Sequence, residues 1–533
     1  MQDSVVTIIW IVSFVVVTVA VSGLTRRIGW SAPVALVVVG AVASFIPGVP
    51  RLEIEPDLIL YGLLPPLLFA AAIRTSFVDV RARRDGILLL SVGLVAFTVV
   101  VVGFTAWLII PAIGLAAAFA FGAVVAPTDA VAVTAVAGRL GLPRRLVTVL
   151  EGESLLNDAT ALVALNAAIL AMASIINPWM VAGDFVIAVV VGAAVGFGVA
   201  GVLAEIRKRL RAPVLDTSLS LVTPYLAFIP AQLLHGSGVL AVVVAGLFLG
   251  YRSPVIQTAE ARIAESINWR TIQFLLENAV FLLMGLALAE IFDGVVEGGQ
   301  GFWPTVGISA VILLALIVSR VVWMLITTSV YRFGPRWLRG RGWSYRTGIA
   351  VSFAGIRGVV TLAAAFLLPV ETPDRAFLQF LAFVVVAGTL LEGLALPWII
   401  RRLRLPPPDV AQERSETQRL MVEAQTAGLD LLDLLEQQEL DGVEPGVVER
   451  LRTNARFLAE ALDNPPENDS ESRPASYNRL RRLMVQAERQ AVLDARREGR
   501  YEERAVKTTL AFIDAEETAL DMHKPPKPGS NLT

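Results

Sequence analysis

The chain has 533 residues, of which 55% are hydrophobic and only 17% are charged, with a formal net charge of −2. A soluble domain carries about a quarter of its residues as charged side chains, so this composition excludes a soluble globular fold for most of the chain. Cysteine is absent, which excludes disulfides and thiolate metal sites. Most charged residues lie beyond position 400, so we expect a membrane domain over residues 1–404 and a different region over 405–533.

The first 400 residues divide into about thirteen apolar runs, each close to the roughly 20 residues that a helix needs to cross a bilayer. The first run lacks a basic start and a cleavage site, so we interpret it as a spanning helix and not as a signal peptide. The predicted spans are 4–23, 31–48, 57–73, 87–110, 114–137, 146–173, 180–204, 214–232, 236–250, 268–290, 304–330, 345–369 and 377–400.

Basic residues concentrate in alternate loops between these spans. The odd-numbered loops hold most of the basic residues, such as Arg26 and Arg27 in the first and Arg207, Lys208, Arg209 and Arg211 in the seventh, whereas the even-numbered loops carry mainly acids. Because Lys and Arg gather in cytoplasmic loops, this alternation predicts a multi-pass plasma-membrane protein. Its amino end is expected outside and its carboxyl end in the cytoplasm.

The region 405–533 opens with the sequence "LPPPD", which ends the last predicted span. Amphipathic patterns follow in 411–440 and 444–463, and a charged pattern runs over 476–522. We expect a solvated helical cytoplasmic tail, which leaves open whether it binds a regulatory ligand or protein.

A short set of ionisable residues remains inside the predicted spans. Each costs about 2.5–3.5 kcal/mol at a helix centre, so each needs a partner or a function. The acids outnumber the arginines, so at least two carboxyl groups must be protonated or must hold a mobile cation, while Glu277, Arg320 and Arg357 are expected in structural salt bridges. The residues at depth are Asp129, Glu151, Glu153, Asp158, Glu277, Arg320 and Arg357.

The fifth predicted span contains the sequence "GAVVAPTDAVAV". Pro127 removes a backbone donor and interrupts the helix there, leaving carbonyl groups without partners beside Thr128 and Asp129. Non-helical backbone at membrane depth is tolerated where it lines a cavity, and broken helices form the ion sites of many transporters. A buried Asp at the break therefore indicates an ion site.

The sixth span contains "EGESLLNDATALVAL". Ser154 and Asp158 are four residues apart and share one face of a helix, whereas Glu153 and Asn157 share a neighbouring face. The first stripe could coordinate a hard cation and the second could anchor the helix to an arginine. Such oxygen ligands suit alkali cations. Glu151, one turn earlier, has no assigned role.

The twelfth span contains "VSFAGIRGVVTLAAAF", residues 351–366. Gly355 and Gly358 flank Arg357 and allow another backbone to approach closely. Fixed positive charge here would help to keep Glu153 ionised.

The three motifs, in this order and spacing, resemble the monovalent cation:proton antiporter-1 family, which includes NhaP-type proteins and sodium/proton exchangers. The resemblance covers roughly residues 5–400. It implies an NhaA-like antiporter fold: a homodimer whose thirteen helices include inverted repeats and two crossed broken helices. Its core is expected to move as an elevator, with membrane lipids and a second copy as partners and no nucleic acid.

By position, the resemblance implies that Asp158 binds the cation and the proton in turn. Transported Na⁺ would be ligated by Asp158, Asp129, Ser154 and Thr128, with Asn157 completing an Asn-Asp pair and no other metal or cofactor required.

The same resemblance implies a salt bridge from Glu153 to an arginine, and leaves open whether Arg320 or Arg357 provides it. One position departs from the pattern. Some relatives carry a Glu after "LLF" in the third span, where this chain has Ala70.

We therefore expect a Na⁺/H⁺ antiporter, with Li⁺ as a further cation, and not an enzyme. Low-dielectric surroundings raise the pKa of a carboxyl group in general, which lets it exchange a proton for a cation near neutral pH. Asn157, in place of a second Asp, predicts electroneutral exchange of one proton per cation. The alternatives are K⁺/H⁺ antiport, a cation channel, and an intramembrane hydrolase using Ser154; His235 is the only histidine of the membrane part.

Overall fold

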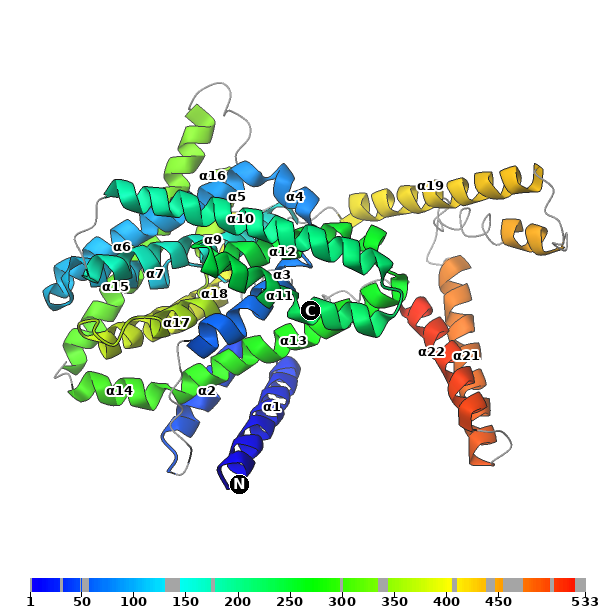
Figure 1. Ribbon diagram of the computed structural model, residues 1–533, viewed down its shortest axis with the longest axis horizontal. Coiled ribbons are helices and arrows are strands. Elements are labelled where there is room, and N and C mark those ends of the chain that lie inside the picture. The colour runs from blue at the N-terminus through cyan, green and yellow to red at the C-terminus, as the bar shows by residue number, and fades with distance from the viewer. Residues whose placement is uncertain are drawn as a thin grey trace. The chain divides into compact units, whose positions relative to one another are not determined.

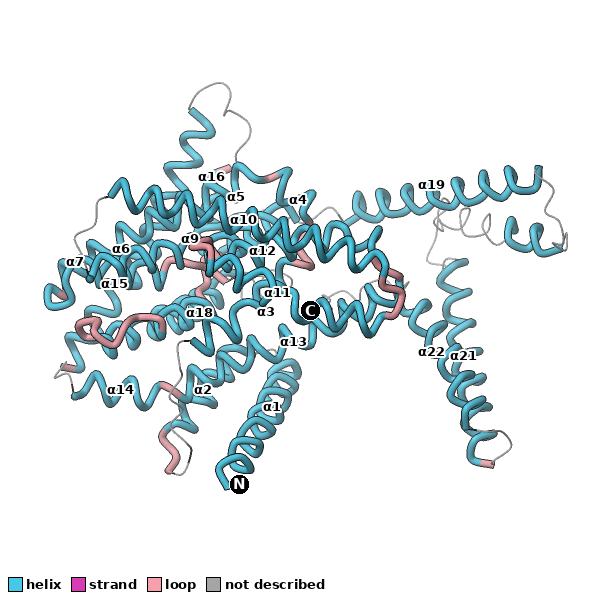
Figure 2. Tube along the Cα trace, viewed as in Figure 1, coloured by secondary structure: helices cyan, strands magenta, loops and turns pink. Residues whose placement is uncertain are grey.

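The computed structural model describes residues 2–28, 32–47, 49, 57–129, 144–173, 178–297, 301–333, 344–404, 410–437, 446–453, 473–498 and 503–522. The chain forms two compact units, Met1–Pro406 and Pro407–Thr533. Across these ranges all regular structure is helical and strands are absent (Figure 2). The predicted all-α class is therefore confirmed for the part of the chain that is described.

The first unit is a bundle of long apolar helices with shorter pieces between them (Figure 1). Its elements are α1 (Gln2–Ile28), α2 (Ala32–Ser44), η1 (Leu58–Leu63), α3 (Leu64–Ala72), α4 (Phe77–Ala82), α5 (Arg84–Leu88), η2 (Leu89–Leu94), α6 (Val95–Ile109), η3 (Pro111–Ile113), α7 (Gly114–Val125), α9 (Arg144–Ala173), α10 (Pro178–Arg209), α11 (Pro213–Leu233), α12 (Gly238–Ile256), α13 (Ala259–Leu286), α14 (Leu288–Glu297), α15 (Phe302–Phe333), α16 (Tyr345–Phe353), α17 (Val359–Phe366) and α18 (Arg375–Leu403).

Length and composition show which of these helices can cross a membrane. Within the described ranges, eight are long and apolar enough to do so: Arg84–Ile109, Leu146–Met172, Gly183–Arg209, Pro213–Leu233, Gly238–Ile256, Ala259–Asp293, Phe302–Phe333 and Arg375–Gly393. Shorter apolar helices lie at Val12–Thr25, Ala32–Ser44, Leu58–Ala72 and Pro111–Val125. The chain is thus a multi-pass membrane protein, whereas the count of thirteen spans stays a prediction.

Small residues bring α13 and α2 into close contact. A Cβ placed on Gly40 of α2 would meet the carbonyl oxygen of Leu282, and one on Gly285 of α13 would meet that of Val37. Only glycine allows two helix backbones to approach this closely, which is how small residues drive helix packing in membranes. The contact fixes α13, which carries Glu277, against the α2 wall.

Two helices of the bundle end in its interior. α7 ends at Val125, and residues 126–129 are non-helical although the apolar run continues. Pro127 accounts for this break, because it has no N–H to continue the helical ladder. α16 ends at Phe353, and α17 starts only at Val359. The break predicted at Pro127 is present; residues 130–137, the rest of that predicted span, lie outside the described residues.

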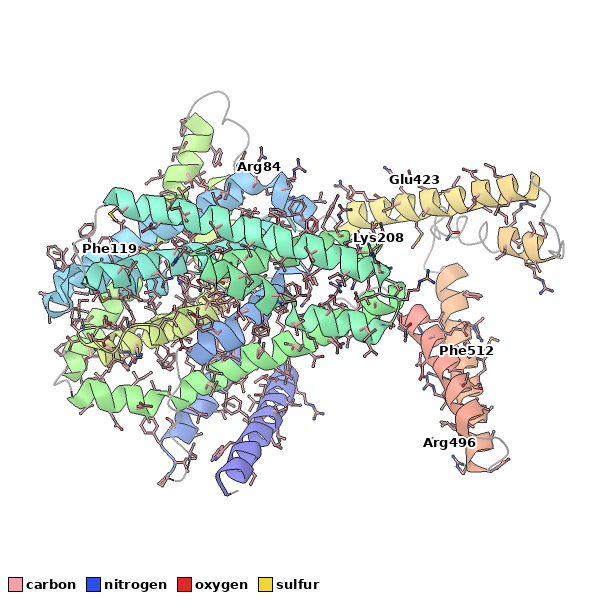
Figure 3. All side chains as sticks on the ribbon, viewed as in Figure 1. Arg84, Phe119, Lys208, Glu423, Arg496 and Phe512 are labelled. Carbon is pink, nitrogen blue, oxygen red and sulfur yellow. The ribbon has the colours of Figure 1, made fainter. Side chains whose placement is uncertain are left out.

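The second unit contains α19 (Val410–Gln437), α21 (Arg473–Arg497) and α22 (Glu503–Met522), and Figure 3 shows their side chains. α21 and α22 pack side by side as a hairpin. Ion pairs join them: Arg481 holds the two carboxylate oxygens of Glu516, both at 2.6 Å, and Arg489 pairs with Asp514 at 2.7 Å. Helix therefore dominates the described part of the tail, while its cytoplasmic location stays a prediction.

Candidate ion-binding site

The two non-helical stretches meet inside the bundle. The backbone N–H of Asp129 donates to the carbonyl of Ile356 at 2.8 Å, and the Thr361 hydroxyl donates to the carbonyl of Pro127 at 3.4 Å. These two hydrogen bonds satisfy the Asp129 N–H and the Pro127 carbonyl, which the broken helix leaves without helical partners. Polar groups inside a membrane require such partners. The result is a polar crossing point within an apolar core.

One face of α9 holds the first stretch in place through Thr128. The Ser154 hydroxyl donates to the Thr128 carbonyl, and the Asn157 amide donates to that carbonyl at 3.3 Å and to the Thr128 hydroxyl oxygen at 2.9 Å. The Thr128 hydroxyl in turn donates to Glu153 at 3.2 Å. The carbonyl and hydroxyl of Thr128 are therefore occupied with positioning the backbone of the break.

Glu153 pairs with Arg320 of α15, which answers the question left open by the motifs. The guanidinium contacts the two carboxylate oxygens at 2.6 and 3.0 Å, and both side chains are about 2% exposed. A third donor of Arg320 reaches the Val351 carbonyl at 3.1 Å. Such a bidentate pair is fully hydrogen-bonded, the condition under which burying two opposite charges is tolerated.

Arg357 belongs to the second non-helical stretch, residues 354–358, and its side chain contacts main-chain carbonyl groups instead of Glu153. Its guanidinium donates to the carbonyls of Gly355 and Val125, the latter at 3.3 Å. The backbone N–H of Arg357 donates to the Thr389 hydroxyl at 3.0 Å. Arg357 therefore fastens the second stretch to the end of α7 and is not the salt-bridge partner of Glu153.

Asp158 lies one turn after Ser154 on α9, beside a cavity of about 50 Å³. Its side chain is 5% exposed, and its Oδ1 atom has no hydrogen-bond partner among the described residues; the same holds for Oδ1 of Asn157. A buried acceptor left without a donor is costly. Such an atom is what an incoming proton or cation would satisfy.

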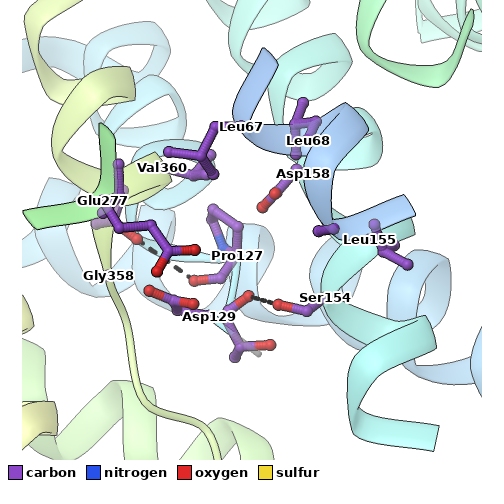
Figure 4. A pocket seen from close by; sticks show the side chains of 14 residues that line it. Leu67, Leu68, Pro127, Asp129, Ser154, Leu155, Asp158, Glu277, Gly358 and Val360 are labelled. Atoms are coloured by element: carbon purple, nitrogen blue, oxygen red, sulfur yellow. Dashed lines mark hydrogen bonds between the residues drawn. The ribbon is translucent and has the colours of Figure 1, made fainter. Parts of the chain in front are cut away.

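Asp129, Ser154 and Thr128 line the same cavity as Asp158, so the structure brings four of the five predicted ion-binding residues to one space (Figure 4). Asn157 stands behind them, holding Thr128. Their roles as ion ligands stay a prediction. Glu151 lies outside this lining, one turn earlier on α9.

Glu277 differs from the prediction made for it. We expected a structural salt bridge, but no described Lys or Arg pairs with it; its carboxylate accepts from Gln273 at 2.7 Å and lines the cavity. It reaches this space from α13, and Figure 4 shows it on the same side as Asp129. This position could not be predicted from the residues of α13 alone, because the placement of α13 depends on the packing of α2 against it.

Two further features of the cavity were not anticipated. Leu67, Leu68 and Ala71 of α3 form an apolar wall. Gly358 lies against the Asp129 carboxylate, so that a Cβ at this position would collide with it. The glycine had been expected to allow a close approach, and here the approaching group is the Asp129 side chain.

The donor set suits an alkali cation better than a transition metal. Residues with carboxylate and hydroxyl oxygens line the site, and such oxygens are the ligands of hard cations. Across the described residues, no group of three or more His, Cys, Asp or Glu side chains is placed to hold a metal ion. A cavity of about 50 Å³ admits a small cation with water, given that a single water needs about 10–15 Å³ by this measure.

The sequence profile of the family described as "Sodium/hydrogen exchanger, transmembrane" matches residues 12–402. The chain belongs to this family. An uncharacterised Na⁺/H⁺ exchanger of Mycobacterium tuberculosis is 34% identical over 529 residues, which cover 96% of this chain and 95% of the relative. The family resemblance predicted from the motifs is confirmed, and this exchanger family consists of cation/proton antiporters and not enzymes.

Two other relatives bear on the ion and on the fold. A "sodium, potassium, lithium and rubidium/H⁺ antiporter" of Bacillus pumilus is 32% identical over 401 residues, 71% of this chain and 59% of the relative. The solved structure of the sodium proton antiporter MjNhaP1 of Methanocaldococcus jannaschii matches with a TM-score of 0.62 at 17% identity, over 75% of this chain and 99% of the other. The latter likeness shows the antiporter fold.

Proposed function

We propose that this exchanger moves Na⁺ against H⁺, one proton per cation, with Asp158 carrying the two ions in alternation. The observation that supports this is the buried Oδ1 of Asp158, which faces a cavity with Asp129 and lacks a donor among the described residues. If one carboxylate holds either a proton or a cation, and faces each side of the membrane in turn, each transport step must exchange one for the other.

The charge of the neighbouring residue supports the stoichiometry. Asn157 is neutral and is occupied with Thr128, so Asp158 is the one titratable group of the pair. Exchange of one proton for one monovalent cation moves no net charge. The rate is then independent of membrane potential.

We further propose the arrangement implied by the family: thirteen spans containing inverted repeats, two broken helices that cross, and a homodimer in which the core moves as an elevator. The contact between residue 129 and residue 356 supports the crossing. The amino end would face outside the plasma membrane and the tail would lie in the cytoplasm, as the alternation of basic loops predicts.

K⁺ is the second candidate cation. The relative from Bacillus pumilus bears a name that includes potassium, lithium and rubidium beside sodium, and the cavity at Asp158 is lined by oxygen atoms that do not distinguish alkali cations by type. We therefore expect Na⁺ and Li⁺ to be exchanged, and K⁺ to be tested beside them.

The experiment is proton-coupled exchange in proteoliposomes, followed by dequenching of a pH-sensitive dye on addition of Na⁺, Li⁺ or K⁺. Wild-type protein should respond to Na⁺, and Asp158→Asn should abolish the response to every cation. Glu260→Gln, an exposed acid on α13, is the matched control and should behave as wild type. Sustained pH-dependent flux in Asp158→Asn would refute the mechanism, and a rate that follows a valinomycin-imposed potential would refute the stoichiometry.

A further inference from the structure

Glu277 has a setting that differs from the other acids of the site. It projects from α13, whereas Asp129 and Asp158 come from the end of α7 and from α9. α13 packs against α2 and α3 and touches α17. The third carboxyl group therefore enters the cavity from a separate wall, and its position is set by the tight α2–α13 contact.

A hydrogen-bonded chain orients this carboxylate. Arg74, exposed just beyond the end of α3, donates to the side-chain oxygen of Gln273 at 3.0 Å. The guanidinium can only donate, so the amide oxygen of Gln273 must face Arg74 and its nitrogen must face the other way. That nitrogen donates to Glu277 at 2.7 Å. The chain thus runs from an exposed arginine to the cavity, with Gln273 buried between them.

The wall formed by α3 makes this carboxylate more important. The α3 residues that reach the cavity, Leu67, Leu68 and Ala71, are apolar. On these two walls of the cavity, α3 contributes no carboxylate and α13 contributes Glu277.

The charges around the cavity are unbalanced. Its lining contains Asp129, Asp158 and Glu277 and no Lys, Arg or His among the described residues. Arg320 is engaged with Glu153 and does not reach the lining. When ionised, a carboxylate in a space walled by protein attracts a cation over several ångströms and is screened less by salt than a surface charge. This attraction acts at a distance, so it does not require Glu277 to coordinate the ion.

We propose that Glu277 is a cation-recruiting residue of the transport cavity. Its carboxylate, oriented by Gln273, raises the affinity of the cavity for the incoming alkali cation, while Asp158 alone exchanges that cation for a proton. This role rests on the proposed antiport, because it assigns Glu277 to the capture of the same transported ion. The two tasks then belong to two helices: Glu277 of α13 captures the cation, and Asp158 of α9 exchanges it for a proton.

The test compares apparent affinity with maximal rate in proteoliposomes containing the full-length protein. Glu277→Gln keeps the shape and the acceptor for Gln273 but removes the charge, so the KM for Na⁺ should rise about tenfold while the maximal rate stays within about twofold of wild type. Glu260→Gln, on the same helix but away from the cavity, should change neither quantity. Gln273→Leu, which releases the carboxylate but keeps its charge, should raise the KM by a smaller factor.

A second readout needs no transport. Na⁺ should raise the melting temperature of the detergent-solubilised wild-type protein, and about tenfold more Na⁺ should be needed to produce the same shift in Glu277→Gln. Unchanged KM and an unchanged Na⁺ midpoint in Glu277→Gln overturn the proposal. Complete loss of exchange with normal folding also overturns it, since Glu277 would then be an obligatory carrier. Should Glu277→Gln not fold, an unchanged KM in Gln273→Leu overturns the oriented-carboxylate role.

Failure of the proposed function has a different signature. If wild-type protein exchanges none of Na⁺, Li⁺ or K⁺ for protons, the antiport proposal fails. The Na⁺-dependent melting shift, measured on wild type and Glu277→Gln, still decides whether Glu277 strengthens cation binding.

Discussion

Two buried ionic clusters of this protein use the same kinds of side chain for opposite purposes. The first joins α10, α11 and α13 around Arg207, which is 1% exposed. Its guanidinium holds the two oxygens of Asp216 at 2.8 Å and one oxygen of Glu265 at 2.6 Å. Gln257 donates to both acids, at 2.6 and 3.0 Å. Both carboxylates of this cluster are therefore hydrogen-bonded to the one buried guanidinium.

The second cluster, around Asp158, is left incomplete. Asp158 and Asn157 each keep an acceptor oxygen without a donor among the described residues, and both oxygens are buried. A saturated cluster fixes helices relative to one another, because any rearrangement exposes an unpaired charge to low dielectric. An unsaturated one stores binding capacity for an external ion. If the Asp158 cluster is the transport site proposed above, satisfaction of the acceptors, and not the number of acids, separates it from the structural cluster.

The largest effect is expected when the saturated cluster around Arg207 is broken. Arg207→Met leaves Asp216 and Glu265 buried without a cation and should lower the free energy of unfolding by about 3–5 kcal/mol. Asp158→Asn removes an acid that has no cationic partner, so its melting temperature should match or exceed that of wild type. Thermal melting in detergent measures both, with exposed Lys208→Met as the control for Arg207. Equal destabilisation by the two variants would contradict the contrast.

A smaller effect is expected when the unsaturated cluster around Asp158 is disturbed by a substitution at Gly358. A Cβ on Gly358 would collide with the Asp129 carboxylate, so Gly358→Ala should displace that carboxylate and raise the KM for Na⁺ severalfold. Overpacking of this kind costs about 1–3 kcal/mol. Gly198→Ala in α10, where a Cβ meets nothing within 4 Å, is the matched control and should leave exchange unchanged. Wild-type KM in Gly358→Ala would show that Asp129 does not need its present position.

The smallest effect concerns the exposed ion pairs of the tail. The hydrogen bond from Arg481 lowers the pKa of Glu516 below its ordinary value of 4.5. The pair therefore stabilises the α21–α22 hairpin fully above about pH 4.5, and this contribution is lost as pH falls through the lowered pKa. Hydrogen exchange over residues 473–522 of the full-length protein should be faster at pH 3.5 than at pH 5 after correction for the intrinsic rate. The pH dependence should shrink in Glu516→Gln, and an unchanged dependence would rule out this pair as its source.

Much of this arrangement follows from the sequence, because it depends on local chemistry. Apolar runs give the spans, Pro127 gives the break, and the four-residue spacing of Ser154 and Asp158 gives one face of α9. The family was recognisable for the same reason, since its motifs carry their residues within a few positions. The sequence does not predict which side chains from distant parts of the chain come into contact.

The arginine that pairs with Glu153 illustrates this limit. Arg320 and Arg357 lie in equally apolar surroundings, and only the packing of α15 against its neighbours, α16 among them, brings Arg320 to the pair. The Arg207 cluster was missed because Arg207 was assigned to a solvated loop, and a positive-inside pattern does not reveal that a loop-end arginine is buried. Asp216, three residues after Pro213 at the start of an apolar span, was the available signal.

The hydrogen bond between Asp129 and Ile356 has a consequence for how such a site can change over generations. Donor and acceptor are both main-chain atoms, so side-chain substitution at either residue leaves the bond in place. The backbone arrangement of the site therefore does not depend on which side chains these two residues carry. Selectivity could drift among alkali cations, one side chain at a time, without dismantling the junction that holds the two broken helices together.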